Sequence, residues 1–138
     1  MKGHFSTFPW FSERWPNFTP AELSCPCCGE MFYDPHAFDA LQRVRTELDQ
    51  QLKINSAHRC ALHNRRVGGA ARSMHKQIAF DMSLRGQDPL ALLRAARRAG
   101  FTGYGYYGTF LHVDLGKPRS WHTKEGLKKW AGLLTSSR

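Results

Sequence analysis

Apolar residues recur at helical spacing in two segments of this chain. The first segment begins at Asp34-Pro35, where an aspartate suits a helix N-cap and a proline suits the first turn. Its apolar stripe consists of Phe38, Leu41, Val44, Leu48 and Leu52. The second segment begins at Asp88-Pro89, has its stripe at Leu90, Leu93 and Arg97 between alanines, and stops at Gly100. Both patterns predict amphipathic helices.

Two other segments alternate with the period of a strand. From Ile78 onward, one face is expected to consist of Phe80, Met82 and Leu84, and the polar, small-residue face of Ala79, Asp81 and Ser83. In 110–115, the apolar face consists of Leu111, Val113 and Leu115, and the other of Phe110, His112 and Asp114. A short strand is expected in 53–57 and a glycine- and tyrosine-rich turn region in 103–108. The class is therefore α+β, with helices around a small antiparallel sheet.

The two ends of the chain differ from this central part. Residues 1–24 are rich in aromatic residues and read as an irregular arm packed against the domain. The tail, 122–138, contains a basic amphipathic stretch with Leu127, Trp130, Ala131 and Leu134 on one side. We expect this tail to dock onto the domain and not to enter a membrane. A chain of 138 residues is one domain, 1–138, and no stretch approaches the length of a membrane span.

The charge balance favours polyanionic partners. Twenty Lys and Arg against eleven Asp and Glu give a formal charge of +9. The basic residues are scattered along predicted helices, as in Arg94–Arg98, without a compact recognition motif. We therefore expect affinity for anionic envelope polymers such as teichoic acid or lipopolysaccharide, and no specific nucleic-acid binding. A purely solubilising surface is the alternative.

Three residues have the composition of a catalytic metal site. Asp81 and His112 lie on the non-apolar faces of their strands, and His75 precedes the first strand in a loop. Two imidazoles and one carboxylate are a common ligand set for catalytic zinc, with the fourth position left for water. The alternative is two unrelated surface histidines and an aspartate at a strand end.

The motif Ser73-x-His75-x-x-x-Ala79-x-Asp81, followed by a strand with His112-Val113-Asp114, resembles the zinc D-Ala-D-Ala carboxypeptidase family. That family also holds cell-wall endopeptidases, phage endolysins and the Hedgehog signalling domain. Further stretches resemble its short branch in prophages and bacterial cell-wall hydrolases; they are Asn55–Cys60, His63-Asn64 through Gly68-Gly69, and Gly103–Tyr107. The likeness covers about residues 15 to 121, with the motifs in the family's order.

The resemblance implies the Hedgehog/DD-peptidase fold and a monomeric zinc metallopeptidase that cleaves next to D-amino acids in peptidoglycan. Zn²⁺ would be held by His75, Asp81 and His112. Arg59 would bind substrate and steady the oxyanion, because a guanidinium stays charged and offers a planar fork of donors. Ser73 would hydrogen-bond near the metal loop. Tyr104, Tyr106 and Tyr107 are candidates to line the cleft, with Tyr106 expected to contact substrate, although aromatic core is the default for such residues. Carboxypeptidase and endopeptidase actions both stay open.

The general base is the weakest part of this interpretation. Many relatives have an acidic residue three positions before the last histidine ligand, or a histidine two before it, where this chain has Thr109 and Phe110. Asp114 is the remaining nearby carboxylate, and it would be either the base or a group that orients a ligand. The family usually has glycine where Ile78 stands. A non-catalytic zinc-dependent binding module is therefore the alternative function.

Four cysteines form a three-plus-one pattern, with Cys25, Cys27 and Cys28 close together and Cys60 far along the chain. A four-cysteine zinc site more often has two pairs, and adjacent Cys27 and Cys28 are not expected to bind one ion easily. A disulfide to Cys60, a second metal site and reduced thiols all stay open. A nucleic-acid-binding zinc protein built on these cysteines is the remaining rival function.

The N-terminal sequence, Met1–Ser6, lacks the apolar run and cleavage site of a secretory signal. We therefore expect a protein made in the cytoplasm that reaches the cell wall after lysis or phage delivery, unless a signal has been trimmed.

Overall fold

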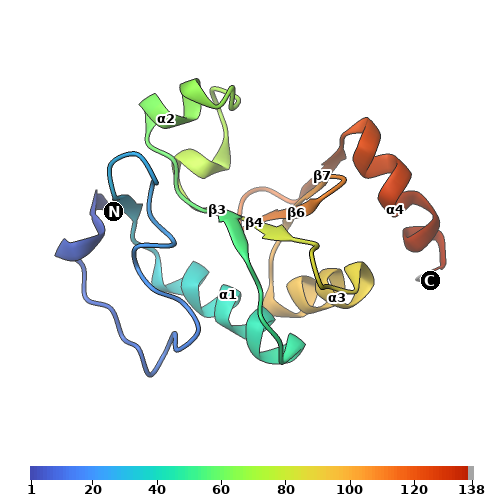
Figure 1. The fold of residues 1–138 in the computed structure, drawn as a ribbon, viewed down its shortest axis with the longest axis horizontal. Coiled ribbons are helices and arrows are strands. Elements are labelled where there is room, and N and C mark those ends of the chain that lie inside the picture. The colour runs from blue at the N-terminus through green and yellow to red at the C-terminus, as the bar shows by residue number, and fades with distance from the viewer. Residues whose placement is uncertain (137–138) are drawn as a thin grey trace.

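The computed structural model describes residues 1–136 and centres on a five-stranded sheet (Figure 1). In spatial order its strands are β3 (Ile54–Ser56), β4 (Ala79–Ser83), β6 (Phe110–Asp114), β5 (Gly103–Tyr106) and β7 (Arg119–His122). Neighbouring strands are antiparallel except for β5 and β7, which are parallel. A separate antiparallel pair joins β1 (Lys2–His4) to β2 (Glu30–Phe32). The predicted α+β class is confirmed, with one parallel strand pair added to the expected antiparallel sheet.

Two helices, α1 (Pro35–Leu48) and α3 (Pro89–Ala99), pack against each other beside the sheet (Figure 1). Each begins as predicted, with an aspartate whose side chain accepts a backbone N–H of the first turn, at Ala37 for Asp34 and at Leu90 for Asp88. The first helix ends earlier than its stripe suggested, because Asp49 takes a left-handed conformation with φ 51°. Leu52 therefore lies beyond the helix, although it is buried in the core.

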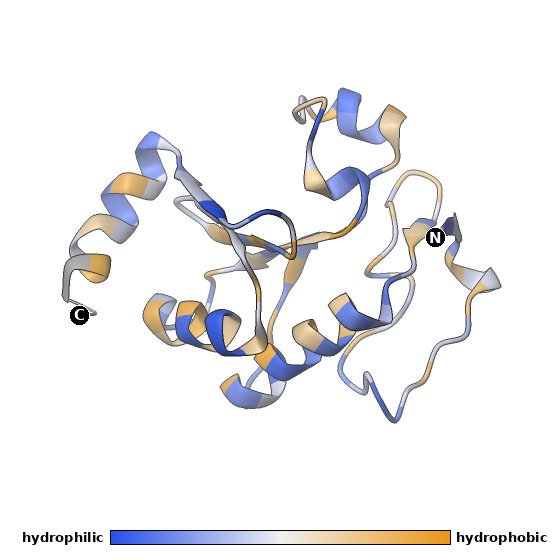
Figure 2. Ribbon diagram, turned by 180° about the vertical axis from the view of Figure 1, so that it is seen from behind, coloured by the Kyte–Doolittle hydropathy of each residue, from blue (hydrophilic) through white to orange (hydrophobic). Residues whose placement is uncertain are grey.

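The predicted buried face of α3 was right at Leu93 and its flanking alanines and wrong at Leu90 and Arg97. Leu90 is only half-buried and Arg97 is exposed. The buried residues are Leu92, Leu93, Ala95, Ala96 and Ala99. Small alanines let α3 lie close to α1, and this packing between helices selects a face that apolar spacing alone does not identify. Figure 2 shows hydrophilic and hydrophobic residues on both helices, as expected for helices with one face toward the core.

The strands differ from their predicted patterns in two ways. All five residues of β4 are buried, so the face that carries Asp81 is covered as well as the apolar one. The segment 103–106 is strand β5 and not a turn region. Its glycines serve close packing, because a Cβ on Gly103 would lie 2.1 Å from an oxygen of Asp114 and from a nitrogen of Arg119. Glycine in a strand often marks such an approach.

The last helix, α4 (Lys124–Ser136), docks onto β5 and the residue that follows it. Trp130 is buried, its Nε1–H donates to the Tyr107 carbonyl at 3.0 Å, and its ring packs on Tyr106. The expected apolar side is only partly buried, since Leu127 is 50% exposed. Residues 137–138 of the predicted tail lie outside the described residues. Within 1–136, no helix combines the length and the apolarity that a membrane crossing needs.

The N-terminal residues contribute to the core and are not only a surface arm. Besides β1, they include a short 3-10 helix, η1 (Phe5–Thr7), and an irregular segment that packs against α1. Trp15 is fully buried, and its Nε1–H donates to Asp39 Oδ1 on α1 at 2.9 Å. A bidentate ion pair from Arg14 reaches the same carboxylate.

Candidate metal centre

Three separate elements bring His75, Asp81 and His112 together. His75 lies in a 3-10 turn, η2 (Met74–Lys76), which Ser73 caps by accepting the His75 N–H at 3.1 Å. Asp81 on β4 and His112 on β6 are direct partners across the antiparallel pair. Directly opposed residues project their side chains to the same face of a sheet. The strand pairing therefore sets two of the three side chains, and the η2 turn supplies the third.

The three side chains converge on one point. His75 Nε2 lies 3.0 Å and His112 Nδ1 3.1 Å from Asp81 Oδ1, and the two nitrogens are 3.2 Å apart. At zinc–ligand distances of about 2.0–2.2 Å, ligand atoms of a tetrahedral site lie roughly 3.3–3.6 Å apart. The observed separations are close to these values, and the donor types suit zinc. The set therefore fits a metal ion.

The remaining nitrogen of each imidazole is held by a neighbour. His75 Nδ1–H donates to the Ala57 carbonyl at 2.5 Å, and His112 Nε2–H donates to Asp114 Oδ2 at 2.6 Å. Both bonds fix the orientation of the rings so that the other nitrogen of each faces Asp81, where a bound metal would take the place of its proton. Burial by itself would raise the pKa of Asp81, but the hydrogen bonds from His112 and His75 prevail and lower it to about 2. The carboxylate is thus ionised, as a ligand must be.

Asp114 does not have the surroundings expected of a general base. Its Oδ1 accepts from Gly116 N–H at 2.9 Å and from Arg119 Nη1 at 2.7 Å. Its Oδ2 accepts from His112 and, at 2.8 Å, from Arg119 Nη2. Burial would raise its pKa, but the bonds from His112, Arg119 and Gly116 lower it below the ordinary range. A buried carboxylate with both oxygens occupied is a poor proton acceptor, so the geometry supports the orienting role instead.

A cleft of about 950 Å³ opens over the three ligands, and Arg59 lies in its wall. The backbone N–H of Arg59 donates to the His75 carbonyl at 2.6 Å, which fixes the arginine beside the loop that carries His75. Among the described residues, Arg59 Nε and Asn64 Oδ1 are buried without a hydrogen-bond partner. Buried polar atoms usually have one. The Arg59 side chain lines the cleft, where its charged guanidinium suits a carbonyl or carboxylate oxygen of a ligand.

Gly69 creates the room for this arrangement. A Cβ at this position would lie 2.1 Å from Asn64 Oδ1 and 2.7 Å from Arg59 Nη1. The close approach of the backbone to Asn64 and Arg59 at this position therefore depends on the absence of a side chain.

Other predicted residues divide between the cleft and the core. Ser73 lines the cleft, where it also caps η2. Tyr106 packs on Trp130 and is not among the lining residues, whereas Tyr107 is. The expected place of Tyr106 beside a substrate is therefore wrong, and of the three candidate tyrosines it is Tyr107, directly after β5, that lies in the cleft wall.

The sequence interpretation missed Arg119 and Trp121, which both line the cleft from β7. Arg119 holds Asp114, and the Trp121 Nε1–H donates to the Tyr107 hydroxyl at 3.0 Å. An arginine and a tryptophan two positions apart after the last ligand strand were the available signal.

The cysteines also come together, away from the histidines. The sulfur atoms of four cysteines all lie within 4.8 Å of one another; they belong to Cys25, Cys27, Cys28 and Cys60. All four thiols are free.

Comparison with known proteins agrees with this geometry. A search of curated proteins finds no significant match. The family described as Peptidase M15 matches residues 16–114, which include the three ligands, Arg59 and all four cysteines. The match covers most of the chain and confirms the resemblance drawn from its motifs. The chain therefore belongs to the M15 peptidase family.

Proposed function

We propose that this protein is a zinc metallopeptidase that hydrolyses peptide bonds next to D-amino acids in peptidoglycan stem peptides or cross-links. The observation that carries the proposal is the convergence of His75 Nε2, Asp81 Oδ1 and His112 Nδ1 under a cleft whose wall holds Arg59. Membership of a peptidase family supports the reaction type.

The residues of the site divide the work between holding a metal and holding a substrate. His75, Asp81 and His112 would hold a zinc ion, which would supply the Lewis acidity that activates water and polarises a peptide carbonyl. Asp114 and the Ala57 carbonyl keep both imidazoles in the orientation that binding requires. Arg59 would offer its guanidinium to a substrate oxygen from the cleft wall, where a charged donor stabilises developing negative charge.

The charge of the cleft suits an anionic substrate. Its lining includes Arg59, Arg72 and Arg119, against the carboxylates of Glu22 and Asp81. The charge of Arg119 is already paired with Asp114, so Arg59 and Arg72 are the arginines that would attract the free carboxylates of stem peptides. The net charge of +9 supports attraction to anionic wall polymers in the same way.

The engagement of Asp114 favours a second candidate, a zinc-dependent binding module without turnover. Among the described residues that line the cleft, the only carboxylates are Glu22 and the ligand Asp81. A peptidase therefore needs its proton carrier from another group, and Glu22, His63 and Tyr107 are the titratable side chains in the lining that are neither ligands nor permanently charged.

Mass spectrometry of fragments released from purified sacculi distinguishes the two candidates. Zinc-loaded protein is expected to release new muropeptides whose masses identify the bond, and chelation or His75→Ala should abolish the release. Binding to sacculi without any new fragment, in several wall chemistries, would instead establish the binding module. The masses also separate loss of terminal D-alanine from cleavage of a cross-link.

A further inference from the structure

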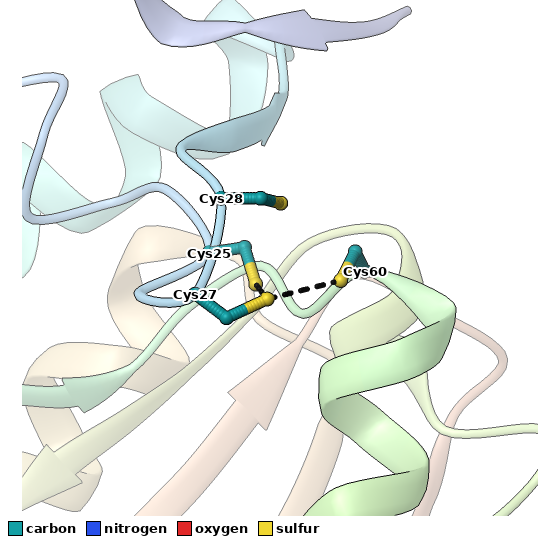
Figure 3. A group of neighbouring side chains, drawn as sticks. All are labelled: Cys25, Cys27, Cys28 and Cys60. Atoms are coloured by element: carbon teal, nitrogen blue, oxygen red, sulfur yellow. Dashed lines mark hydrogen bonds between the residues drawn. The ribbon is translucent and has the colours of Figure 1, made fainter.

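The four cysteines form a second cluster with the composition of a metal site (Figure 3). The Cys27 sulfur lies 3.5 Å from the Cys25 sulfur and 3.4 Å from the Cys60 sulfur. Cys28 completes the group, in which all sulfurs lie within 4.8 Å of one another. Adjacent Cys27 and Cys28 thus both place a sulfur in the group, although the sequence interpretation expected that they do not easily bind one ion.

A tight turn gathers the first three cysteines. The Cys25 carbonyl accepts the N–H groups of Cys28 at 3.4 Å and Gly29 at 2.8 Å, and the Cys25 N–H donates to the Glu30 carbonyl at 2.7 Å. Gly29 has φ 78°, a left-handed conformation that suits glycine and turns the chain back toward β2.

The fourth cysteine approaches from the other side of the cluster. Cys60 caps α2 (Ala61–Arg66), and its sulfur accepts the His63 N–H at 3.4 Å. A backbone N–H directed at sulfur stabilises the thiolate, which is the form that binds metals.

We propose that Cys25, Cys27, Cys28 and Cys60 bind a structural zinc ion, separate from the ion of the peptidase site. Sulfur atoms around a tetrahedral zinc at about 2.3 Å lie roughly 3.8 Å apart. The observed contacts of 3.4 and 3.5 Å are close to that separation. A disulfide would use only two of the four thiols, whereas one zinc ion uses all of them and leaves no coordination position open for water.

The cysteine cluster lies beside the cleft, so an ion bound there would stabilise part of the cleft wall. It joins two segments that each supply a cleft residue next to a cysteine, namely Pro26 and Arg59. A second link joins the same segments, because the fully buried His58 contacts Glu30 Oε1 through Nε2 at 2.7 Å. Zinc at the cysteines thus holds the Arg59 wall against the N-terminal segment.

Metal counting on reduced, full-length protein tests the proposal without any activity measurement. Wild-type protein is expected to contain two zinc ions per chain, and the double variant His75→Ala, His112→Ala only one. Cys60→Ser should also contain one ion, bound at the histidines. Leu62→Ser, an exposed position beside Cys60, is the matched control and should retain both ions.

Cobalt substitution identifies the ligands of each ion. Cobalt in the double-histidine variant should give intense sulfur-to-metal charge transfer, which Cys60→Ser should lose. Cys28→His replaces one ligand by another, so it should keep the ion with weaker charge transfer. If Cys60→Ser fails to fold, wild-type protein supplies the test, because all four thiols should resist alkylation until a chelator is added.

Three results would overturn the proposal. They are absence of zinc from a folded double-histidine variant, no sulfur-to-cobalt charge transfer, and a native mass lower by two hydrogens with only two titratable thiols, which would establish a disulfide. Each is independent of peptidase activity, so failure of this proposal and failure of the proposed function are distinguishable.

Discussion

Asp114 Oδ2 accepts a hydrogen bond from His112 Nε2 at 2.6 Å, and this contact decides which nitrogen of the imidazole faces the metal site. Arg119 holds the same carboxylate through both terminal nitrogens. Arg119, Asp114 and His112 are thus linked by hydrogen bonds that run from β7 to the candidate ligand on β6. These contacts favour a positioning role for Asp114 over that of a general base, and such a role predicts a defect in metal binding.

Asp114→Asn should weaken zinc binding at the histidine site about 10–100-fold, because the amide no longer accepts from His112 with a full negative charge. Competition with a chromophoric chelator measures this affinity. Asp39→Asn, a similar change on α1 away from the cleft, should leave it unaltered. Unchanged zinc affinity together with lost turnover in Asp114→Asn would restore Asp114 as the general base.

Arg59→Lys should lower kcat/KM on muropeptides about 10–100-fold while zinc content stays the same. Lysine keeps the charge but lacks the planar fork, which makes it a poor replacement where a guanidinium holds an oxygen. Steady-state kinetics and metal analysis on one preparation test both halves. The control is Arg66→Lys, at an exposed position on α2 outside the cleft. Equal kinetics in both variants would remove Arg59 from substrate binding.

Gly69→Ala should impair turnover far more than Gly68→Ala. The added methyl group at 69 meets Asn64 Oδ1 and Arg59 Nη1, whereas one at 68 meets no atom within 4 Å. At 68 the cost is conformational, since φ is 73° there, and should amount to about 1 kcal/mol of stability. Thermal melts and kinetics on both variants separate the two effects. Greater loss of activity in Gly68→Ala would contradict the packing argument.

Trp130→Ala should destabilise the protein by about 3–5 kcal/mol, because it empties a fully buried site and removes the bond to the Tyr107 carbonyl. Chemical unfolding measures the change. Leu127→Ala on the same helix should stay within about 0.5 kcal/mol, since Leu127 is half-exposed. Similar values for both variants would show that α4 does not stabilise the sheet through Trp130.

The ion pair between Arg14 and Asp39 should give stability that disappears in acid. The hydrogen bond from Arg14 holds the pKa of Asp39 below its usual value. A lowered pKa in the folded state means that the contribution is complete above the unfolded pKa of about 3.9 and is lost as pH falls through the folded value.

Asp39→Asn should therefore lower Tm by up to about 4 °C at neutral pH, a difference that shrinks below about pH 4. Melts of both proteins across this range test the prediction. Glu47→Gln, which breaks a similar exposed pair with Arg98, should show a smaller effect because no buried tryptophan donates to Glu47. A difference for Asp39→Asn that persists in acid would assign the loss to the Trp15 contact instead.

The sequence by itself determined the features that depend on local chemistry. Caps at Asp34 and Asp88 locate helix starts because the side chain bonds to its own first turn. Alternation placed Asp81 and His112 on the non-apolar faces of two strands, and the motifs identified the family.

Only the tertiary structure decided how distant segments meet. The pairing of β4 with β6 opposes Asp81 to His112, and the parallel placement of β7 beside β5 brings Arg119 to Asp114. That contact occupies the carboxylate of Asp114, which favours its role in orienting His112 over that of a general base. Likewise, Cys60 reaches the turn at Cys25–Gly29 through folding and not through spacing. Strand register and long-range packing depend on the whole core, because each contact is formed between residues whose local sequences carry no information about one another.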